Sequence, residues 1–126
     1  MSRHADWLAQ GHNDIEWAEH SLLGGFYSQT CFIAQQAAEK FLKALCYYRE
    51  LDVVKTHSLF KIVEALGING SMLERAKRLD LYYIPARYPD AFPAGAPFEM
   101  FSQEQAQVAI EDASAIAKCV VEELRE

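Results

Sequence analysis

Residues 26–50, FYSQTCFIAQQAAEKFLKALCYYRE, decide the fold. This stretch holds no proline and no glycine, and its small and apolar residues recur with the period of an α-helix. They form two adjacent stripes, one of Cys31, Ala34, Ala38, Leu42 and Leu45, and one of Ala37, Phe41, Ala44 and Tyr48. Two neighbouring apolar stripes are typical of a central helix that touches several partners.

Helical periodicity continues on both sides of this stretch. Glycines at positions 24, 25, 67 and 70 mark breaks, and all four prolines fall between residues 85 and 97. The other apolar stripes are Leu8, Gly11, Ile15, Ala18 and Leu22; Leu59, Val63 and Leu66; Met72, Ala76, Leu79 and Tyr83; and Ala106, Ala109, Ala113, Ile116, Val120 and Leu124. We expect helices near residues 3–23, 27–50, 57–66, 71–84 and 103–124 and no sheet. The chain therefore predicts one all-α bundle domain, residues 1–126, with a long proline-rich loop before its last helix.

Three helix starts can be predicted from side chains that cap backbone N–H groups. Thr56 is the expected N-cap of the third helix. Ser71 and Glu74, and Ser102 and Gln105, have the spacing of a capping box, which predicts the starts of the fourth and last helices.

Composition narrows the class of protein. No apolar run approaches the ~20 residues that a membrane-spanning helix needs. The first ten residues, MSRHADWLAQ, carry charges where a signal peptide needs an apolar core. The three cysteines, Cys31, Cys46 and Cys119, lie in apolar helical patterns without C-x-x-C spacing, so we expect buried free thiols. These features predict a cytoplasmic protein without a membrane segment.

The net charge of −6 argues against a general nucleic-acid coat. The charge is unevenly distributed, however. Residues 26–90 carry nine basic and seven acidic side chains, whereas the rest of the chain carries three basic and eleven acidic ones. An anion-binding face is therefore expected from the middle of the chain.

The proline-rich loop begins within LYYIPARYPDAFPAGAPFEM, residues 81–100. Its apolar side chains are too many for a disordered linker, and Pro85 and Pro89 favour extended geometry at Ile84 and Tyr88. A packed strap across the end of the bundle explains the prolines and the aromatic rings. It does not explain Arg87, whereas phosphate or base recognition does, so the strap and a binding site stay open as alternatives.

Other polar residues give weaker signals. Gln36, Lys40, Lys43 and Tyr47 form a polar stripe, which on spacing alone is a solvated face with a Glu39–Lys43 pair worth about 0.3–0.5 kcal/mol. His57 lies at the expected start of the third helix, where its dipole favours the neutral imidazole.

No metal, cofactor or catalytic residue is predicted. His12 and His20 would lie about 12 Å apart along a helix, too far to share one ion. A single His–Glu pair with Glu16 supplies at most two of the ligands a metal needs. The common nucleotide-binding, zinc-protease and serine-hydrolase motifs are absent.

Several residues taken together, in order along nearly the whole chain, resemble the HEPN domain family (higher eukaryotes and prokaryotes nucleotide-binding). They are Trp7 and Asp14, Gly25-Phe26-Tyr27, QQAAEKFLKAL at 35–45, THSL at 56–59, and Tyr83 with Arg87-Tyr88-Pro89-Asp90. The chain is similar to small stand-alone prokaryotic members that are often paired with a minimal nucleotidyltransferase.

The resemblance implies an up-and-down four-helix bundle with an additional short helix, and a homodimer. Many members are metal-independent ribonucleases with an arginine followed, after four to six residues, by histidine. The permitted positions after Arg87 hold Phe92, Pro93 and Ala94, and His57 lies one position too late after Arg49. The sequence therefore favours a non-catalytic protein over an enzyme.

The resemblance also makes the loop and its neighbours an expected nucleotide- or anion-binding site, with the residues Arg87, Tyr83, Tyr88, Lys40, Lys43 and His57. The leading hypothesis is a protein that binds nucleotide or RNA phosphate and acts with a nucleotidyltransferase partner in a toxin–antitoxin-like pair. Two alternatives remain: a ribonuclease with an unusually spaced Arg/His site, and a structural dimerisation module.

Overall fold

The structure is a computed structural model that describes residues 3–52 and 55–125; positions 1–2, 53–54 and 126 of the predicted domain lie outside the described residues. The described chain is helical and contains no strand, as predicted. Its elements are α1 (His4–Leu23), α2 (Tyr27–Tyr48), α3 (Leu59–Leu66), α4 (Ser71–Asp80), the 3-10 turn η1 (Pro89–Ala91), α5 (Pro97–Met100) and α6 (Gln103–Leu124).

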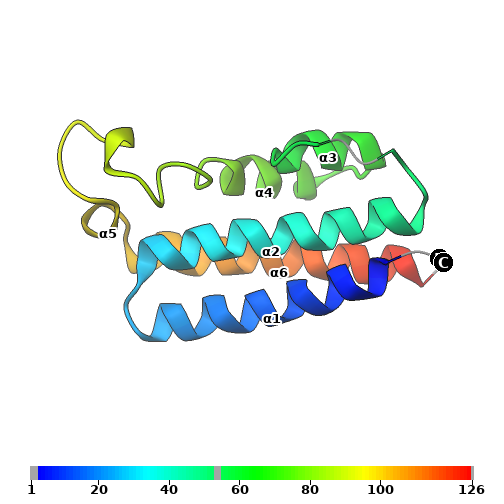
Figure 1. Ribbon diagram of the computed structural model, residues 1–126, viewed down its shortest axis with the longest axis horizontal. Coiled ribbons are helices and arrows are strands. Elements are labelled where there is room, and N and C mark those ends of the chain that lie inside the picture. Colours follow the sequence, from blue (N-terminus) through cyan, green and yellow to red (C-terminus); the bar gives the residue numbers. More distant parts are fainter. Residues whose placement is uncertain (1–2, 53–54, 126) are drawn as a thin grey trace.

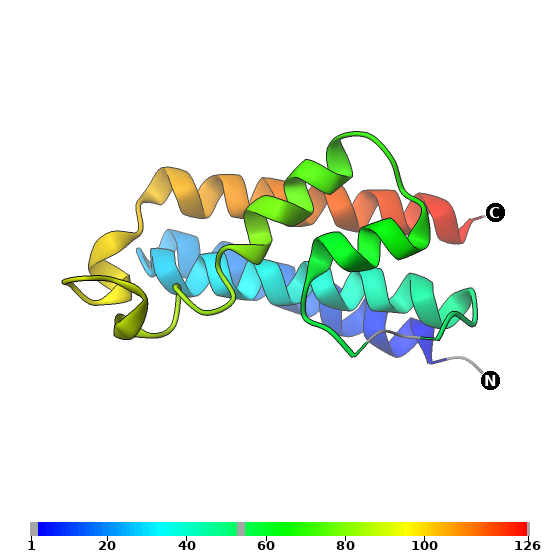
Figure 2. The same cartoon turned by 90° about the horizontal axis from the view of Figure 1, so that it is seen from above.

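The helices form layers about a central pair (Figure 1). α2 and α6 lie side by side in the middle, α1 covers one side, and α3 and α4 cover the other. α1, α2, α4 and α6 alternate in direction, so the bundle is up-and-down with α3 as the additional short helix. Figure 2 shows both chain ends at one end of the bundle, while the loop that carries η1 and α5 extends from the opposite end.

α2 is the central helix that its two apolar stripes predict. Both stripes are buried apart from their last member, Tyr48, which is 42% exposed at the end of the helix. At Gly11 the axis of α1 comes close to α2, because a Cβ there would lie 2.8 Å from Cε2 of Phe41. The glycine is therefore needed for the packing of these two helices.

The helix starts confirm one capping prediction and correct two. The Ser102–Gln105 capping box forms as predicted, with the Ser102 hydroxyl accepting from the Gln105 N–H. The Ser71 capping box was wrong: Gly70 occupies the N-cap, so α4 starts at Ser71 itself.

Thr56 is not the N-cap of α3, which starts at Leu59 instead of residue 57. The cap comes from the end of α4, where the Asp80 carboxylate accepts from the Leu59 N–H (2.7 Å), the Phe60 N–H (3.1 Å) and the Ser58 hydroxyl (3.2 Å). A carboxylate also complements the positive end of the helix dipole. This contact fixes the segment next to His57 against the segment that follows α4.

The long loop is folded more tightly than predicted. α4 ends at Asp80 and not near residue 84, and residues 81–87 form turns instead of a stiff extended run. Tyr88 is extended, as expected before proline. Within the loop, Phe101 contacts the rings of Tyr82 and Phe92, and Phe101 and Ala86 belong to the buried core of the bundle, so the loop packs on the bundle.

The cysteines are free: Cys31 and Cys46 are buried and Cys119 is partly buried. Burial raises the pKa of the Cys31 thiol to about 12, which makes it a poor nucleophile. None of the described helices is long and apolar enough to cross a lipid bilayer.

We predict that Asp80→Ala lowers the free energy of unfolding by about 1–3 kcal/mol, because it removes the acceptor from two N–H groups in the first turn of α3. Chemical denaturation of the variant measures this loss. Asp90→Ala is the matched control, since Asp90 is exposed and no described residue hydrogen-bonds to its side chain. Equal stability of the two variants would contradict the capping role of Asp80.

Candidate functional site

Arg87 lies among three aromatic rings. Its guanidinium carbon is 4.4 Å from the ring centre of Phe32, 4.7 Å from that of Tyr83 and 4.9 Å from that of Tyr88. Its Nε–H donates to the Tyr83 carbonyl at 2.8 Å, which fixes the direction of the guanidinium. The rings hold the cation by electrostatic attraction to their faces and shield it from water.

No carboxylate within the described ranges pairs with Arg87, although the side chain is partly buried. Most other cations of the middle of the chain are paired with carboxylates: Lys40 with Asp14, Lys43 with Glu39, Arg49 with Glu123, and Arg75 and Arg78 with Asp112. A partly buried guanidinium that lacks a counter-charge is suited to an external anion.

His57 approaches the same site from the segment before α3. Its Nδ1 lies 3.1 Å from an oxygen of the Glu39 carboxylate, and its ring stacks on Tyr83 at 4.8 Å between centres. The expected helix-terminal position of His57 was wrong, because α3 begins two residues later. The charged group next to His57 is therefore the Glu39 carboxylate, and not the positive end of a helix dipole.

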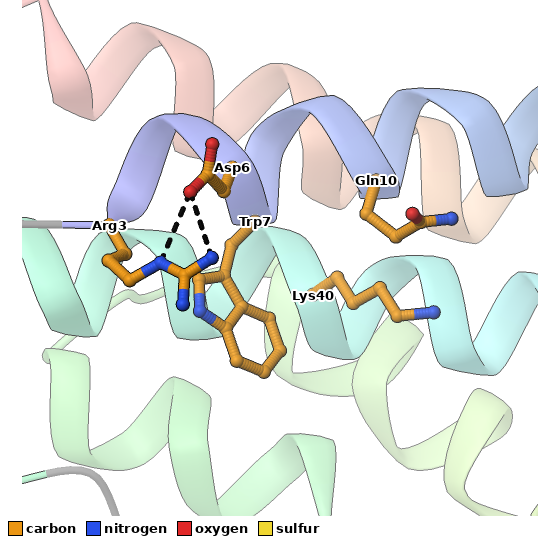
Figure 3. A pocket seen from close by; sticks show the side chains of 5 residues that line it. All are labelled: Arg3, Asp6, Trp7, Gln10 and Lys40. Carbon is orange, nitrogen blue, oxygen red and sulfur yellow. Dashed lines mark hydrogen bonds and ion pairs between the residues drawn. The ribbon is translucent and has the colours of Figure 1, made fainter.

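The two predicted lysines, Lys40 and Lys43, have different partners and lie on different sides of α2 in the structure. Lys43 is 12% exposed and bonds to Glu39 at 2.9 Å, so it joins the site through that carboxylate. Lys40 pairs with the buried Asp14 of α1 and lines a different pocket, shown in Figure 3. There its side chain runs away from Arg3 and Trp7, and Arg3 pairs with Asp6. The structure does not bring Lys40 to Arg87.

Four of the six predicted residues thus form one connected cluster of side chains: Arg87, Tyr83, Tyr88 and His57. Lys43 is reached through Glu39. The Tyr88 ring also lies against Arg87, with its centre 4.9 Å from the guanidinium carbon.

Sequence reasoning missed Phe32 and the role of Glu39. Phe32, Glu39 and Lys43 are spaced at i, i+7 and i+11, so they lie on one face of α2. On this face Phe32 contacts Arg87 from the segment after α4, and Glu39 contacts His57 from the segment before α3. The helical spacing was visible in the sequence. The contacts with His57 and Arg87 were not, since they join positions far apart along the chain.

Two pockets border the cluster. One, of about 340 Å³, is lined by His57, Ser58, Phe60, Asp80, Tyr83, Ile84 and Pro85. The other, of about 280 Å³, is lined by Trp17, Gln29, Phe32, Ile33, Ala86 and Arg87. Tyr88 is 48% exposed, so its ring can stack on a planar group. The cluster therefore combines a charged donor fork, a nearby imidazole and a ring for stacking.

Comparison with known proteins identifies the family. The family model described as the HEPN domain matches residues 4–124. This chain belongs to the HEPN family. The match covers the helices of the bundle and the loop with Arg87, so the cluster is part of the HEPN domain itself.

Solved HEPN-type structures have the same fold. The crystal structure of TT1696 from Thermus thermophilus is 40% identical, with a TM-score of 0.91, and the match covers 97% of this chain and 98% of that one. The archaeal HEPN homologue ST0689 is 34% identical, with a TM-score of 0.84 and 98% of each chain covered. The HEPN domain protein tm0613 from Thermotoga maritima is 27% identical, with a TM-score of 0.79, covering 96% and 98%. No curated protein matches the chain significantly.

Proposed function

We propose that this HEPN protein binds the phosphate of a nucleotide or of RNA at Arg87. The observation that carries the proposal is the partly buried guanidinium, which contacts three aromatic rings and has no carboxylate partner within residues 3–52 and 55–125. A guanidinium binds phosphate through two parallel hydrogen bonds, and the exposed Tyr88 ring supplies a stacking surface for a base. The Arg–x4–6–His pattern is absent, so the proposed role is binding and not catalysis.

The proposed setting is a toxin–antitoxin-like pair with a nucleotidyltransferase partner. This part of the proposal comes from the resemblance to stand-alone HEPN proteins of that type. Tyr88 is the tyrosine that we propose such a partner modifies, because it is exposed and its ring lies beside Arg87. Mass spectrometry of the chain after co-expression with a neighbouring nucleotidyltransferase gene product tests this, and an unmodified Tyr88 would contradict it.

A ribonuclease is the second candidate, and one observation favours it. His57 and Arg87 both contact the ring of Tyr83, so an acid–base group and the proposed phosphate-binding group share one neighbour despite their unusual spacing in sequence. Metal-independent RNA cleavage that is lost in both Arg87→Ala and His57→Ala would establish this candidate. Absence of cleavage by the unaltered protein would leave the binding function.

We predict that Arg87→Lys weakens binding of AMP or a short RNA by about 1–3 kcal/mol, because lysine keeps the charge but not the planar donor fork. Isothermal titration calorimetry measures the affinity, and differential scanning calorimetry on the same sample measures stability. Arg125→Lys is the matched control, since Arg125 is exposed at the end of α6 and has no carboxylate partner in the described ranges. A lowered melting temperature with unchanged affinity would mean that Arg87 only anchors the loop. That result would favour the alternative in which the protein is a structural dimerisation module.

We also propose that the protein is a homodimer. The loop and the turns before it expose several large apolar side chains beyond what the end of a small bundle covers, namely Ile84, Phe98 and Met100. Light scattering at micromolar concentration should give twice the mass of one chain, and Phe98→Ser should lower that mass. Leu23→Ser, which changes an exposed leucine on α1, is the control. A monomer mass for the unaltered protein would contradict the proposal.

A further inference from the structure

The Glu39 carboxylate is buried and shared between two donors. Nδ1 of His57 lies 3.1 Å from one oxygen and 3.2 Å from the other, and this second oxygen also lies 2.9 Å from Nζ of Lys43. Glu39 is 8% exposed and Lys43 is 12% exposed, so their charges compensate each other away from water. A carboxylate that accepts from an ammonium group is an acceptor only, and its second oxygen can accept from the imidazole.

This contact determines the tautomer of neutral His57. Because Glu39 can only accept, Nδ1 of His57 must carry the hydrogen, and Nε2 is left with its lone pair. Nε2 is on the side of the ring away from Glu39, the side chain is 57% exposed, and no described residue bonds to Nε2. A carboxylate behind a histidine fixes ring orientation and tautomer in the same way at other functional sites.

We propose that Glu39 is a positioning residue that makes His57 Nε2 a hydrogen-bond acceptor at the binding site, and that the acceptor selects nucleotides with ribose hydroxyl groups. This inference rests on the proposed nucleotide binding and names the feature of the ligand that the site reads. His57 lines the pocket of about 340 Å³ beside Tyr83, and Arg87 contacts the same tyrosine. In the proposed binding mode the ligand spans Tyr83, with its phosphate at Arg87 and its sugar at His57, where a hydroxyl donates to Nε2.

The ligand arm of the test compares AMP with 2′,3′-dideoxyadenosine monophosphate, which lacks both hydroxyl donors. By isothermal titration calorimetry, the unaltered protein should bind AMP about five- to tenfold more tightly, as one net hydrogen bond implies. His57→Phe keeps a ring on Tyr83 but removes the acceptor, so it should bind both ligands equally. His12→Phe is the control, because His12 is an exposed histidine on α1 and should leave the preference intact.

The tautomer arm needs no ligand. Nitrogen-15 NMR of the histidine ring, recorded at alkaline pH to sample the neutral form, should report Nδ1–H for His57. Glu39→Gln keeps one acceptor oxygen, on the Lys43 side and 3.2 Å from Nδ1, but places an NH₂ donor at the position 3.1 Å from Nδ1. Because that donor disfavours a hydrogen on Nδ1, the share of the Nε2–H tautomer should increase. An Nε2–H tautomer in the unaltered protein, or no change in the variant, would overturn the role of Glu39.

The outcomes separate this inference from the proposed function. Equal binding of the two nucleotides to the unaltered protein overturns the ribose preference and leaves phosphate binding at Arg87 in place. Binding of neither nucleotide overturns the inference, and the RNA titration of Arg87→Lys then decides the proposed function independently. If Glu39→Gln fails to fold, His57→Phe and the NMR of the unaltered protein still decide the inference, since neither disturbs the buried pair.

Discussion

The buried carboxylate of Glu39 is the interaction on which the arrangement of the site depends. A buried charge is stable only with partners, and Glu39 takes one from its own helix and one from the segment before α3. The second contact holds His57 against α2. His57 also stacks on Tyr83, which lies in the same turns as Arg87 and contacts its guanidinium. One helix face therefore organises residues from three separate parts of the chain.

The charge balance bears on how an acidic protein could present the proposed anion site. The middle of the chain has a small excess of basic residues, but several of its cations are matched by carboxylates within the fold. What distinguishes the site is one arginine without such a partner, and not a broad basic patch. The ligand that suits the proposed site therefore carries its own negative charge and a planar group for the neighbouring rings.

Much of the fold followed from local pattern. The stripes of α2 and α6, the Ser102 cap and the confinement of proline predicted the bundle, because helical period and capping depend on residues a few positions apart. The cap of α3 by Asp80 could not be predicted, since its donors and acceptor are about twenty residues apart and meet only when α3 and α4 pack. The sequence also did not predict that α4 ends at Asp80, where residues 81–87 form turns instead of continuing the helix.

The site was predictable only in part for the same reason. The grouping of Tyr83, Arg87 and Tyr88 is local, so the sequence indicated it. The contacts of Phe32 with Arg87 and of Glu39 with His57 join α2 to distant segments, and no spacing rule reveals them. Lys40 was expected at the site because the family resemblance includes the run QQAAEKFLKAL at 35–45, but the buried Asp14 holds it on the side of α2 that faces α1.

If Arg87 is the anion-binding group of this HEPN domain, a crystal structure of the protein with AMP should show a phosphate oxygen within hydrogen-bond distance of the Arg87 guanidinium, with the base against Tyr88. A nucleotide bound elsewhere, such as in the pocket beside Arg3, Trp7 and Lys40, with no phosphate contact to Arg87, would contradict it.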